Sequence, residues 1–339
     1  ANEYVVFAKP QQAALFQARA HLQIVRVSLP TRLLRIVWEQ IRLPALARQY
    51  RLDLLHSPHY TMPFLLPCAS VVTFHDMTFF LYPQVHKAYK RLFFKSMIRL
   101  SAKRASAIIA DSESTRRDIL RVVPITPQKI TAVPLGVSNM FKPMRTPGAL
   151  EEIRRRYQLP AKIILCVGEL QARKNLATLI RAYDRLVQQG LTHSLVIAGR
   201  KGWMYDELFQ AVQSLNLTDR VIFTGYMPEQ DLPLLYNVAD VFVYPSLYEG
   251  FGLPVLEAMA CGIPVVTTNV SSMPEITGDA GVLVDPYDVD YMADAIRRVV
   301  VDREIHAELE CKGLERARMF SWERTAKETV AVYERIAAH

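Results

Sequence analysis

Short apolar runs alternate with longer amphipathic stretches along the whole chain. Eleven runs have the length and composition of buried strands. They cover residues 4–7, 54–56, 70–74, 107–110 and 130–133 in the first half, and 163–167, 194–198, 221–224, 241–244, 265–268 and 281–284 in the second. Between them lie helical patterns, such as the apolar stripe from Leu176 to Val187. Strands alternating with helices predict two α/β domains built on parallel sheets.

Proline and glycine gather between residues 134 and 148, which marks the best linker between the two halves. We therefore predict one domain over residues 1–143 and a second over 144–321, followed by a final helix over 322–339. A chain of 339 residues is long enough for two such cores.

Composition narrows the class of protein. Half of the residues are hydrophobic and 22% are charged, which is typical of a soluble globular protein. No apolar run approaches the ~20 residues that span a bilayer, and no signal-peptide pattern opens the chain. The four cysteines lack the paired spacing of metal or disulfide sites. These features predict a cytoplasmic protein.

Charge divides unevenly between the halves. Residues 1–150 hold 21 Lys and Arg against 7 Asp and Glu, a balance of +14, whereas residues 151–339 hold 20 against 26, a balance of −6. The two halves are therefore expected to meet different partners.

One segment has the strongest chemical signature. After the predicted strand 241–244, Glu249 and Glu257 flank Gly250-Phe251-Gly252-Leu253, and Pro254 favours a helix start, so we expect a helix over 255–261. A carboxylate can accept hydrogen bonds from two vicinal hydroxyls, and a helix N-terminus offers free N–H groups. This arrangement suits a sugar at Glu249 and a ribose at Glu257.

Two other interpretations of this segment exist. The first is a plain glycine-rich turn with one exposed acid and one salt-bridged acid. The second is a dinucleotide fingerprint, which the sequence disfavours because Val255 stands where the third glycine belongs. The order of glycines, proline and helix favours a ligand site.

Further motifs follow in order: Cys166-Val167-Gly168-Glu169-Leu170-Gln171-Ala172-Arg173-Lys174-Asn175, Val196-Ile197-Ala198-Gly199-Arg200, Ile222-Phe223-Thr224-Gly225-Tyr226 and Met273-Pro274-Glu275-Ile276. With the acid-loop-acid segment, they resemble retaining glycosyltransferases of family 4 over nearly the whole chain. The resemblance implies a GT-B fold, with two Rossmann-like domains facing a cleft. It also implies that the last helix crosses back to the first domain.

The resemblance also implies a β-α unit with a glycine-rich loop ahead of the strand at residues 4–7. The sequence starts almost at that strand, so this unit is expected to be missing from it or replaced.

The resemblance assigns roles to individual residues. Glu257 is expected to hold the ribose, with Tyr226 and Met227 along the base and Gly168 beside the phosphates. Glu249, with Gly250, Phe251, Gly252 and Leu253, is expected to hold the donor sugar. Arg173, Lys174 and Arg200 are the cationic candidates for the diphosphate; solvated basic turns are the alternative.

Histidines and acids elsewhere are weaker candidates. His75 follows the predicted strand 70–74 and resembles the family's histidine that contacts the donor sugar; it could also be a polar loop residue. His59 is more readily structural. Asp288 and Asp290 have metal-like spacing, but they open a predicted helix and fit helix capping better, so we expect no metal.

Residues 86–104 combine seven Lys and Arg with seven apolar side chains, including Tyr89, Leu92 and Phe94. We expect a helix whose apolar face packs on the sheet. Its basic excess favours an anionic surface such as the inner face of a membrane, and no nucleic-acid module is recognisable.

These expectations combine into a retaining hexosyltransferase that uses a nucleotide sugar, GDP-mannose or UDP-glucose, and a glycan or lipid-linked acceptor. GDP-mannose is favoured because residues 199–205 look like those of bacterial mannosyltransferases of surface polysaccharide. The alternatives are another GT-B enzyme, such as an epimerase or a phosphorylase, and a non-catalytic basic module that binds anionic polymers or membranes.

Overall fold

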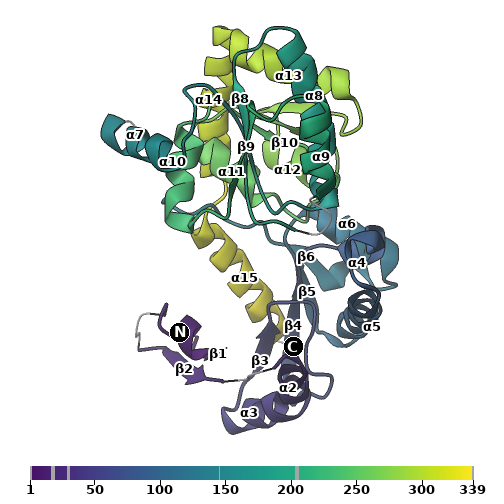
Figure 1. Ribbon diagram of the computed structural model, residues 1–339. Helices are drawn as coiled ribbons and strands as arrows, with labels where there is room; N and C mark the ends of the chain where they lie inside the picture. The colour runs from purple at the N-terminus through teal and green to yellow at the C-terminus, as the bar shows by residue number, and fades with distance from the viewer. Residues whose placement is uncertain (1, 17–19, 29–30, 145, 203–205, 338–339) are drawn as a thin grey trace.

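The chain folds into two α/β lobes, one above the other in Figure 1, in a computed structural model that describes residues 2–16, 20–28, 31–144, 146–202 and 206–337. The N-terminal lobe runs to the end of β6 and the C-terminal lobe from α7 to α14. Two connections join them: the segment between β6 and α7, and the entry into the last helix, α15.

The C-terminal lobe contains a six-stranded parallel sheet in the order β12-β11-β10-β7-β8-β9. The strands are β7 (Ile163–Val167), β8 (Ser194–Ala198), β9 (Val221–Gly225), β10 (Val241–Tyr244), β11 (Val265–Thr268) and β12 (Val282–Val284). The helices are α7 (Pro147–Arg156), α8 (Leu176–Gln188), α9 (Asp206–Ser214), α10 (Leu232–Asn237), α11 (Leu253–Ala260), α12 (Met273–Thr277), α13 (Val289–Val301) and α14 (Arg303–Arg318), with short 3-10 turns at Ala172–Lys174 and Glu229–Asp231.

Alternating residues of each strand fill two separate cores, one on each face of this sheet. In β7, Ile163 and Leu165 belong to the core under α10 and α11, while Ile164 and Cys166 belong to the core under α8 and α13. Because both faces are covered by helices, the strands are apolar throughout, which is why the sequence pattern located them so well.

The N-terminal lobe holds a four-stranded parallel sheet in the order β3-β4-β5-β6. Its strands are β3 (Leu54–Ser57), β4 (Ala69–Phe74), β5 (Ala107–Ala110) and β6 (Ile130–Ala132). Its helices are α2 (Arg32–Val37), which continues through a π-helical turn at Trp38–Arg42 into α3 (Leu43–Gln49), then α4 (Thr78–Leu81), α5 (Ala88–Arg104) and α6 (Glu113–Val122), with 3-10 turns at Pro83–Val85 and Pro127–Lys129.

Two further strands form a separate parallel pair near the N-terminus, β1 (Tyr4–Ala8) and β2 (Leu22–Arg26), with the short helix α1 (Pro10–Ala13) between them. The sequence pattern missed β2, because Gln23 and Arg26 interrupt its short apolar run. Within the described residues, no strand joins this pair to the four-stranded sheet.

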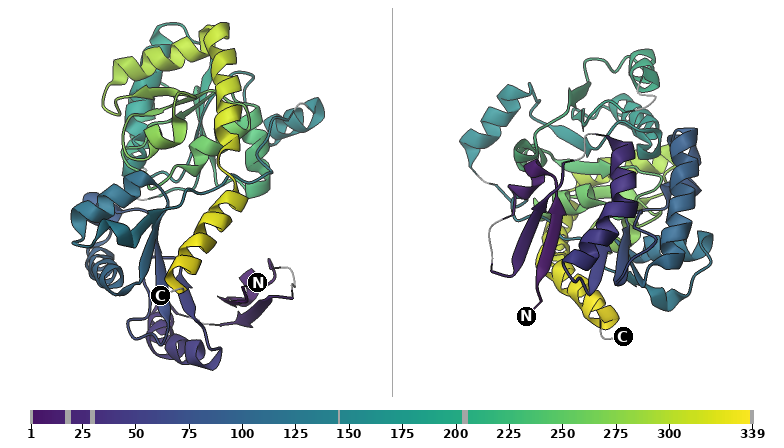
Figure 2. Two further views of the ribbon diagram at one scale, coloured as in Figure 1. Left: turned by 180° about the vertical axis from the view of Figure 1, so that it is seen from behind. Right: turned by 90° about the horizontal axis from the view of Figure 1, so that it is seen from below.

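Helix α15 (Trp322–Ala337) leaves the C-terminal lobe and lies against β3, β4 and β5 of the N-terminal lobe (Figure 2). Tyr333 of this helix hydrogen-bonds His56 on β3, and Thr325 donates to the carbonyl of Pro134 in the connecting segment. The last helix thus ties the two lobes together.

Helix α5 packs only in part. Phe94 and Ile98 face the lobe's core, whereas Tyr89 and Leu92 are 66% and 72% exposed. The expectation that its apolar face packs on the sheet is therefore wrong for these two residues.

None of the helices in the described residues is long and apolar enough to cross a membrane.

Candidate active site

The loop between β10 and α11, residues 245–252, lies at the carboxyl end of its strand and faces the N-terminal lobe. Helix α11 begins at Leu253, two residues before the predicted start, with Pro254 in its first turn. Gly252 has a φ of 114°, and a Cβ at this position would overlap the Met273 side chain. Only glycine fits there without strain.

At Gly250 the backbones of the two lobes come close together. A Cβ on Gly250 would overlap the backbone oxygen of His75 in the N-terminal lobe. The carbonyl of Gly250 also accepts hydrogen bonds from Ser112 Oγ at 2.6 Å and from Thr115 Oγ1 at 3.0 Å. The glycine therefore lets the loop dock directly on the start of α6.

Glu249 is buried in a cluster of charged groups. Its Oε1 lies 2.8 Å from an Arg173 guanidinium nitrogen and 2.6 Å from Lys174 Nζ, and it accepts from the Tyr244 hydroxyl at 3.1 Å. Burial opposes ionisation of Glu249, but Lys174 and Arg173 outweigh it and lower the pKa of this carboxyl to about 2. The structure thus brings Glu249, Arg173 and Lys174 together as one ionic group.

Lys174 itself is 7% exposed, and it also bonds the Tyr244 hydroxyl. The alternative of a solvated basic turn is wrong for this residue. Asn175 occupies the N-cap position of α8, but its side chain makes no capping bond and instead donates to the carbonyl of Pro286.

The start of α11 offers unused donors. The backbone N–H groups of Phe251, Gly252 and Leu253 donate to no other group in the described chain. They lie two to four residues after Glu249, at the positive end of α11. This arrangement can bind hydroxyls or an anionic oxygen.

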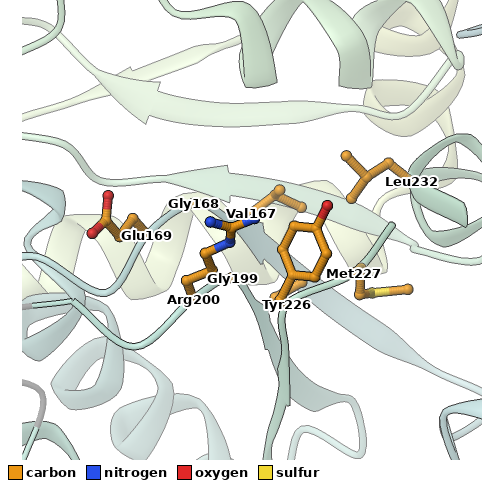
Figure 3. A pocket seen from close by; sticks show the side chains of 9 residues that line it. Val167, Gly168, Glu169, Gly199, Arg200, Tyr226, Met227 and Leu232 are labelled. Atoms are coloured by element: carbon orange, nitrogen blue, oxygen red, sulfur yellow. The ribbon is translucent and has the colours of Figure 1, made fainter. Parts of the chain in front are cut away.

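A cavity of about 250 Å³ lies at the ends of β7, β8 and β9 (Figure 3). Four residues that the sequence analysis assigned to the donor line it: Gly168, Arg200, Tyr226 and Met227. The rest of the lining consists of Val167, Glu169, Ala198, Gly199 and Leu232. The Arg200 guanidinium lies 4.2 Å from the centroid of the Tyr226 ring, a cation–π contact. Tyr226 is 59% exposed, so its ring is accessible to a planar ligand.

Glu257 lies on α11, and its Oε2 accepts from the Tyr236 hydroxyl at 2.9 Å. Burial and the charge of Glu229 raise the pKa of Glu257 to about 7, against the opposing effect of the Tyr236 hydrogen bond. A partly buried carboxylate with one remaining free oxygen can accept further hydroxyl hydrogen bonds.

His75 follows β4 and is held on both ring nitrogens. Nδ1 lies 2.8 Å from Asp111 Oδ2, and Nε2 lies 2.8 Å from the carbonyl oxygen of Pro58. The hydrogen bond that Nδ1 donates to the Asp111 carboxylate is the main cause that raises the pKa of His75. Two acceptors on one imidazole favour its protonated form. His59 packs beside this ring, with centroids 5.7 Å apart.

Asp288 and Asp290, whose spacing resembles that of metal ligands, lie at the start of α13. Asp288 caps α13 by accepting from the backbone N–H of Tyr291 at 2.9 Å. Among the described residues, no three His, Cys, Asp or Glu side chains are grouped as metal ligands. Residues 203–205 of the mannosyltransferase-like segment lie outside the described residues.

Sequence reasoning missed several residues that the fold brings to the site. Leu232 reaches the nucleotide-side cavity from α10, and Tyr244 reaches Glu249 from the end of β10. Ser271 bonds both the backbone N–H and the carbonyl of Glu249. Glu169, which also lines the cavity, is the one missed residue that the sequence could have indicated, because it follows Gly168 directly after a predicted strand.

Comparison with known proteins decides the family. The family models described as "Glycosyltransferase Family 4" and "Glycosyl transferases group 1" match residues 2–139 and 151–316. The O-antigen chain mannosyltransferase B of Escherichia coli is 36% identical over 289 residues, which cover 85% of this chain and 75% of that protein. The chain belongs to glycosyltransferase family 4.

Solved structures agree with this fold. Sucrose-phosphate synthase from Thermosynechococcus elongatus is similar with a TM-score of 0.76 and 25% identity, covering 98% of this chain and 89% of that one. Anabaena HepE, in complex with UDP-glucose, has a TM-score of 0.76 at 19% identity, covering 93% and 86%.

This family 4 glycosyltransferase therefore has the predicted GT-B fold of two Rossmann-like domains, and it is a hexosyltransferase. The comparisons give no support to the alternative of a non-catalytic basic module.

Proposed function

We propose that this glycosyltransferase moves mannose from GDP-mannose to a glycan or lipid-linked acceptor, with retention of anomeric configuration. UDP-glucose is the second candidate donor. Similarity to a mannosyltransferase supports the first sugar, and a structural relative in complex with UDP-glucose supports the second. Residues 144–321 are assigned to the donor and residues 1–143 to the acceptor, with 322–339 joining the domains.

One observation carries this proposal: three kinds of group that suit a nucleotide sugar lie at the carboxyl ends of adjacent strands. The cavity with Arg200 and Tyr226 lies at β7, β8 and β9, the Glu249 cluster follows β10, and the free N–H groups open α11. In a parallel α/β sheet, ligands bind at this edge. The order along the edge matches base, diphosphate and sugar.

Each group then has a definite task. Tyr226 stacks on the base, and Glu257 accepts the ribose hydroxyls. Arg173 and Lys174 stabilise negative charge on the leaving diphosphate, because cations fixed in a buried site act more strongly than cations in water. Since Glu249 already pairs with both, it sets their positions while its second oxygen and the N–H groups of residues 251–253 hold the sugar.

His75 approaches from the other lobe. Because its ring is held between Asp111 and Pro58 beside the acid loop, we assign it to the donor sugar. When the sugar binds, one ring nitrogen of His75 would change its hydrogen-bond partner to a sugar hydroxyl.

Titration calorimetry with GDP and UDP, followed by a transfer assay with each nucleotide sugar, tests the proposal. We expect GDP to bind more tightly and GDP-mannose alone to give product in which the anomeric configuration is kept. Tighter binding of UDP, with transfer from UDP-glucose, would mean that UDP-glucose and not GDP-mannose is the donor. Inverted product would overturn the retaining assignment.

We infer further that the N-terminal lobe docks on anionic lipid through α5. The exposed Tyr89 and Leu92 lie on a helix that carries six Lys and Arg, which suits insertion of apolar side chains between anionic headgroups. Co-sedimentation with anionic vesicles should be strong at low salt and weak with neutral vesicles. Equal binding to both vesicle types would refute a charge-driven docking.

A further inference from the structure

The acid loop, residues 245–252, is held by the other lobe on both sides of Glu249. After Glu249, two hydroxyls at the start of α6 donate to the carbonyl of Gly250. Before it, the hydroxyl of Tyr248 donates to Asp118 Oδ2 at 2.8 Å. Asp118 also belongs to α6, which Figure 1 shows where the two lobes meet. The N-terminal lobe thus fixes both neighbours of the acid that pairs with the cations.

The side chain of Tyr248 is buried, and its hydroxyl makes two hydrogen bonds to the N-terminal lobe. Besides donating to Asp118, it accepts from the backbone N–H of Met77 at 3.1 Å. Burial raises the pKa of Tyr248, and the charge of Asp118 raises it further, so the hydroxyl keeps its proton and acts as a donor. The ring lies 5.2 Å from that of Tyr82, which also belongs to the N-terminal lobe. Tyr248 is therefore a side chain of one lobe anchored in the other.

The backbone of the same residue contacts the cationic group. The carbonyl oxygen of Tyr248 accepts from a guanidinium nitrogen of Arg173 at 3.1 Å, and that nitrogen lies 2.8 Å from Glu249 Oε1. The backbone N–H of Leu247 donates to the carbonyl of Arg173 at 2.8 Å. Three consecutive residues of the acid loop therefore hold Arg173.

A guanidinium carries its N–H donors in a fixed plane, so the acceptors around it determine where its remaining donors point. The orientation of Arg173 consequently depends on the place of the Tyr248 carbonyl. We propose that Tyr248 is a positioning residue for the transfer reaction: its anchorage in the N-terminal lobe orients the Arg173 guanidinium toward the diphosphate. This inference rests on the proposed role of Arg173 and adds the residue that orients it.

The anchorage makes the charge beside the diphosphate depend on contact between the lobes. If the lobes separate, the Tyr248 hydroxyl loses Asp118 and Met77, and Arg173 loses an acceptor whose place is fixed. The alternative is that the hydroxyl only stabilises the contact between the lobes. Its removal would then lower stability and leave Arg173 where it is.

Three variants separate these possibilities. Tyr248→Phe removes the hydroxyl but keeps the ring, Asp118→Ala removes its acceptor, and Asp118→Asn keeps an acceptor oxygen. The first measurement is the NMR signal of the Arg173 Nε–H, which is assigned by its absence in Arg173→Lys. This signal should shift in Tyr248→Phe and Asp118→Ala and lie close to its wild-type position in Asp118→Asn. An unmoved signal in the first two variants would overturn the inference.

The second measurement is titration with GDP, UDP, guanosine and uridine. The ratio of diphosphate affinity to nucleoside affinity reports on the phosphate contact alone. Tyr248→Phe and Asp118→Ala should each lower this ratio about fivefold, as expected for one hydrogen bond, without changing nucleoside affinity. The double variant should lose no more than Tyr248→Phe, because both changes remove the same hydrogen bond. Asp118→Asn should recover most of the ratio.

Tyr291→Phe is the matched control, since Tyr291 is a 46% exposed tyrosine on α13. It should leave both measurements unchanged, and an equal change in this variant would overturn the inference. Equal losses of diphosphate and nucleoside affinity in Tyr248→Phe would overturn it too. If wild-type protein binds neither diphosphate more tightly than its nucleoside, the proposed donor site fails, whereas the Arg173 signal still decides the positioning role.

Discussion

Replacing Glu257 with alanine should weaken nucleotide binding through the ribose alone. The carboxylate is mostly buried on α11 and has one oxygen engaged by the Tyr236 hydroxyl. A bound ribose diol would add two hydrogen bonds to a charged acceptor. Their loss should cost about 1–3 kcal/mol, which is roughly a 5- to 150-fold weaker affinity.

The protonation of Glu257 adds a pH signature. Because its pKa in the free protein is about 7, the carboxyl is protonated below that pH. Hydrogen bonds from the ribose hydroxyls favour the charged form, so binding has to release the proton. GDP affinity of wild type should therefore rise as pH increases toward about 7 and level off above it, whereas Glu257→Gln should lack this slope.

Calorimetry with GDP and with 2′,3′-dideoxy-GDP separates the ribose contact from a general effect on folding. We expect Glu257→Ala to weaken GDP binding and leave the dideoxy nucleotide almost unaffected. An equal loss for both ligands would mean that the substitution damages the site indirectly. Unchanged GDP affinity would mean that Glu257 does not contact the nucleotide, and it would refute the reasoning.

Four further outcomes follow from the structure. Arg173→Ala and Lys174→Ala should lower transfer and GDP affinity while leaving guanosine affinity unchanged, and EDTA should not abolish activity; an equal loss for guanosine would contradict the phosphate role. Glu249→Ala leaves buried Lys174 unpaired, so unfolding in urea should show a loss of about 3–5 kcal/mol, whereas a loss below ~1 kcal/mol would contradict the buried ion pair. Asp111→Asn removes the main cause of the raised His75 pKa, so the histidine should titrate at lower pH by NMR, and an unmoved titration would contradict the pairing. Charge reversal at Lys90, Arg91 and Lys95 should abolish pelleting with anionic vesicles at low salt without changing GDP affinity; loss of both would mean that the patch is structural.

Stability should also report on Glu257. The pKa of this carboxyl is about 7 in the folded protein against an ordinary value of 4.5, so the folded state binds the proton more tightly than the unfolded chain. Folding stability from this group is therefore present below pH 4.5 and is lost as pH rises to about 7. Glu257→Gln should gain stability relative to wild type above pH 7, measured by urea unfolding at several pH values. No difference between the two proteins across that range would contradict the raised pKa.

The sequence by itself determined the local elements. Buried parallel strands are apolar on both faces, so β7, β8, β10 and β11 stood out with their bounds, and Pro254 with the preceding glycines marked the start of α11 within two residues. The acid loop and the cationic motif could be assigned to one sheet edge because every parallel strand ends there. The half-polar strand β2 lacked such a signal.

Tertiary structure alone decided which side chains pair. Nothing in the spacing showed that Lys174 is buried against Glu249, 75 positions away, or that Asp111 holds His75 across two strands. A cavity of about 670 Å³ likewise forms only where α6 of one lobe meets residues 269–271, Pro274 and Glu275 of the other. Periodicity records which face of an element is buried, whereas pairing and cavities depend on how distant elements are oriented, and that information is spread over the whole chain.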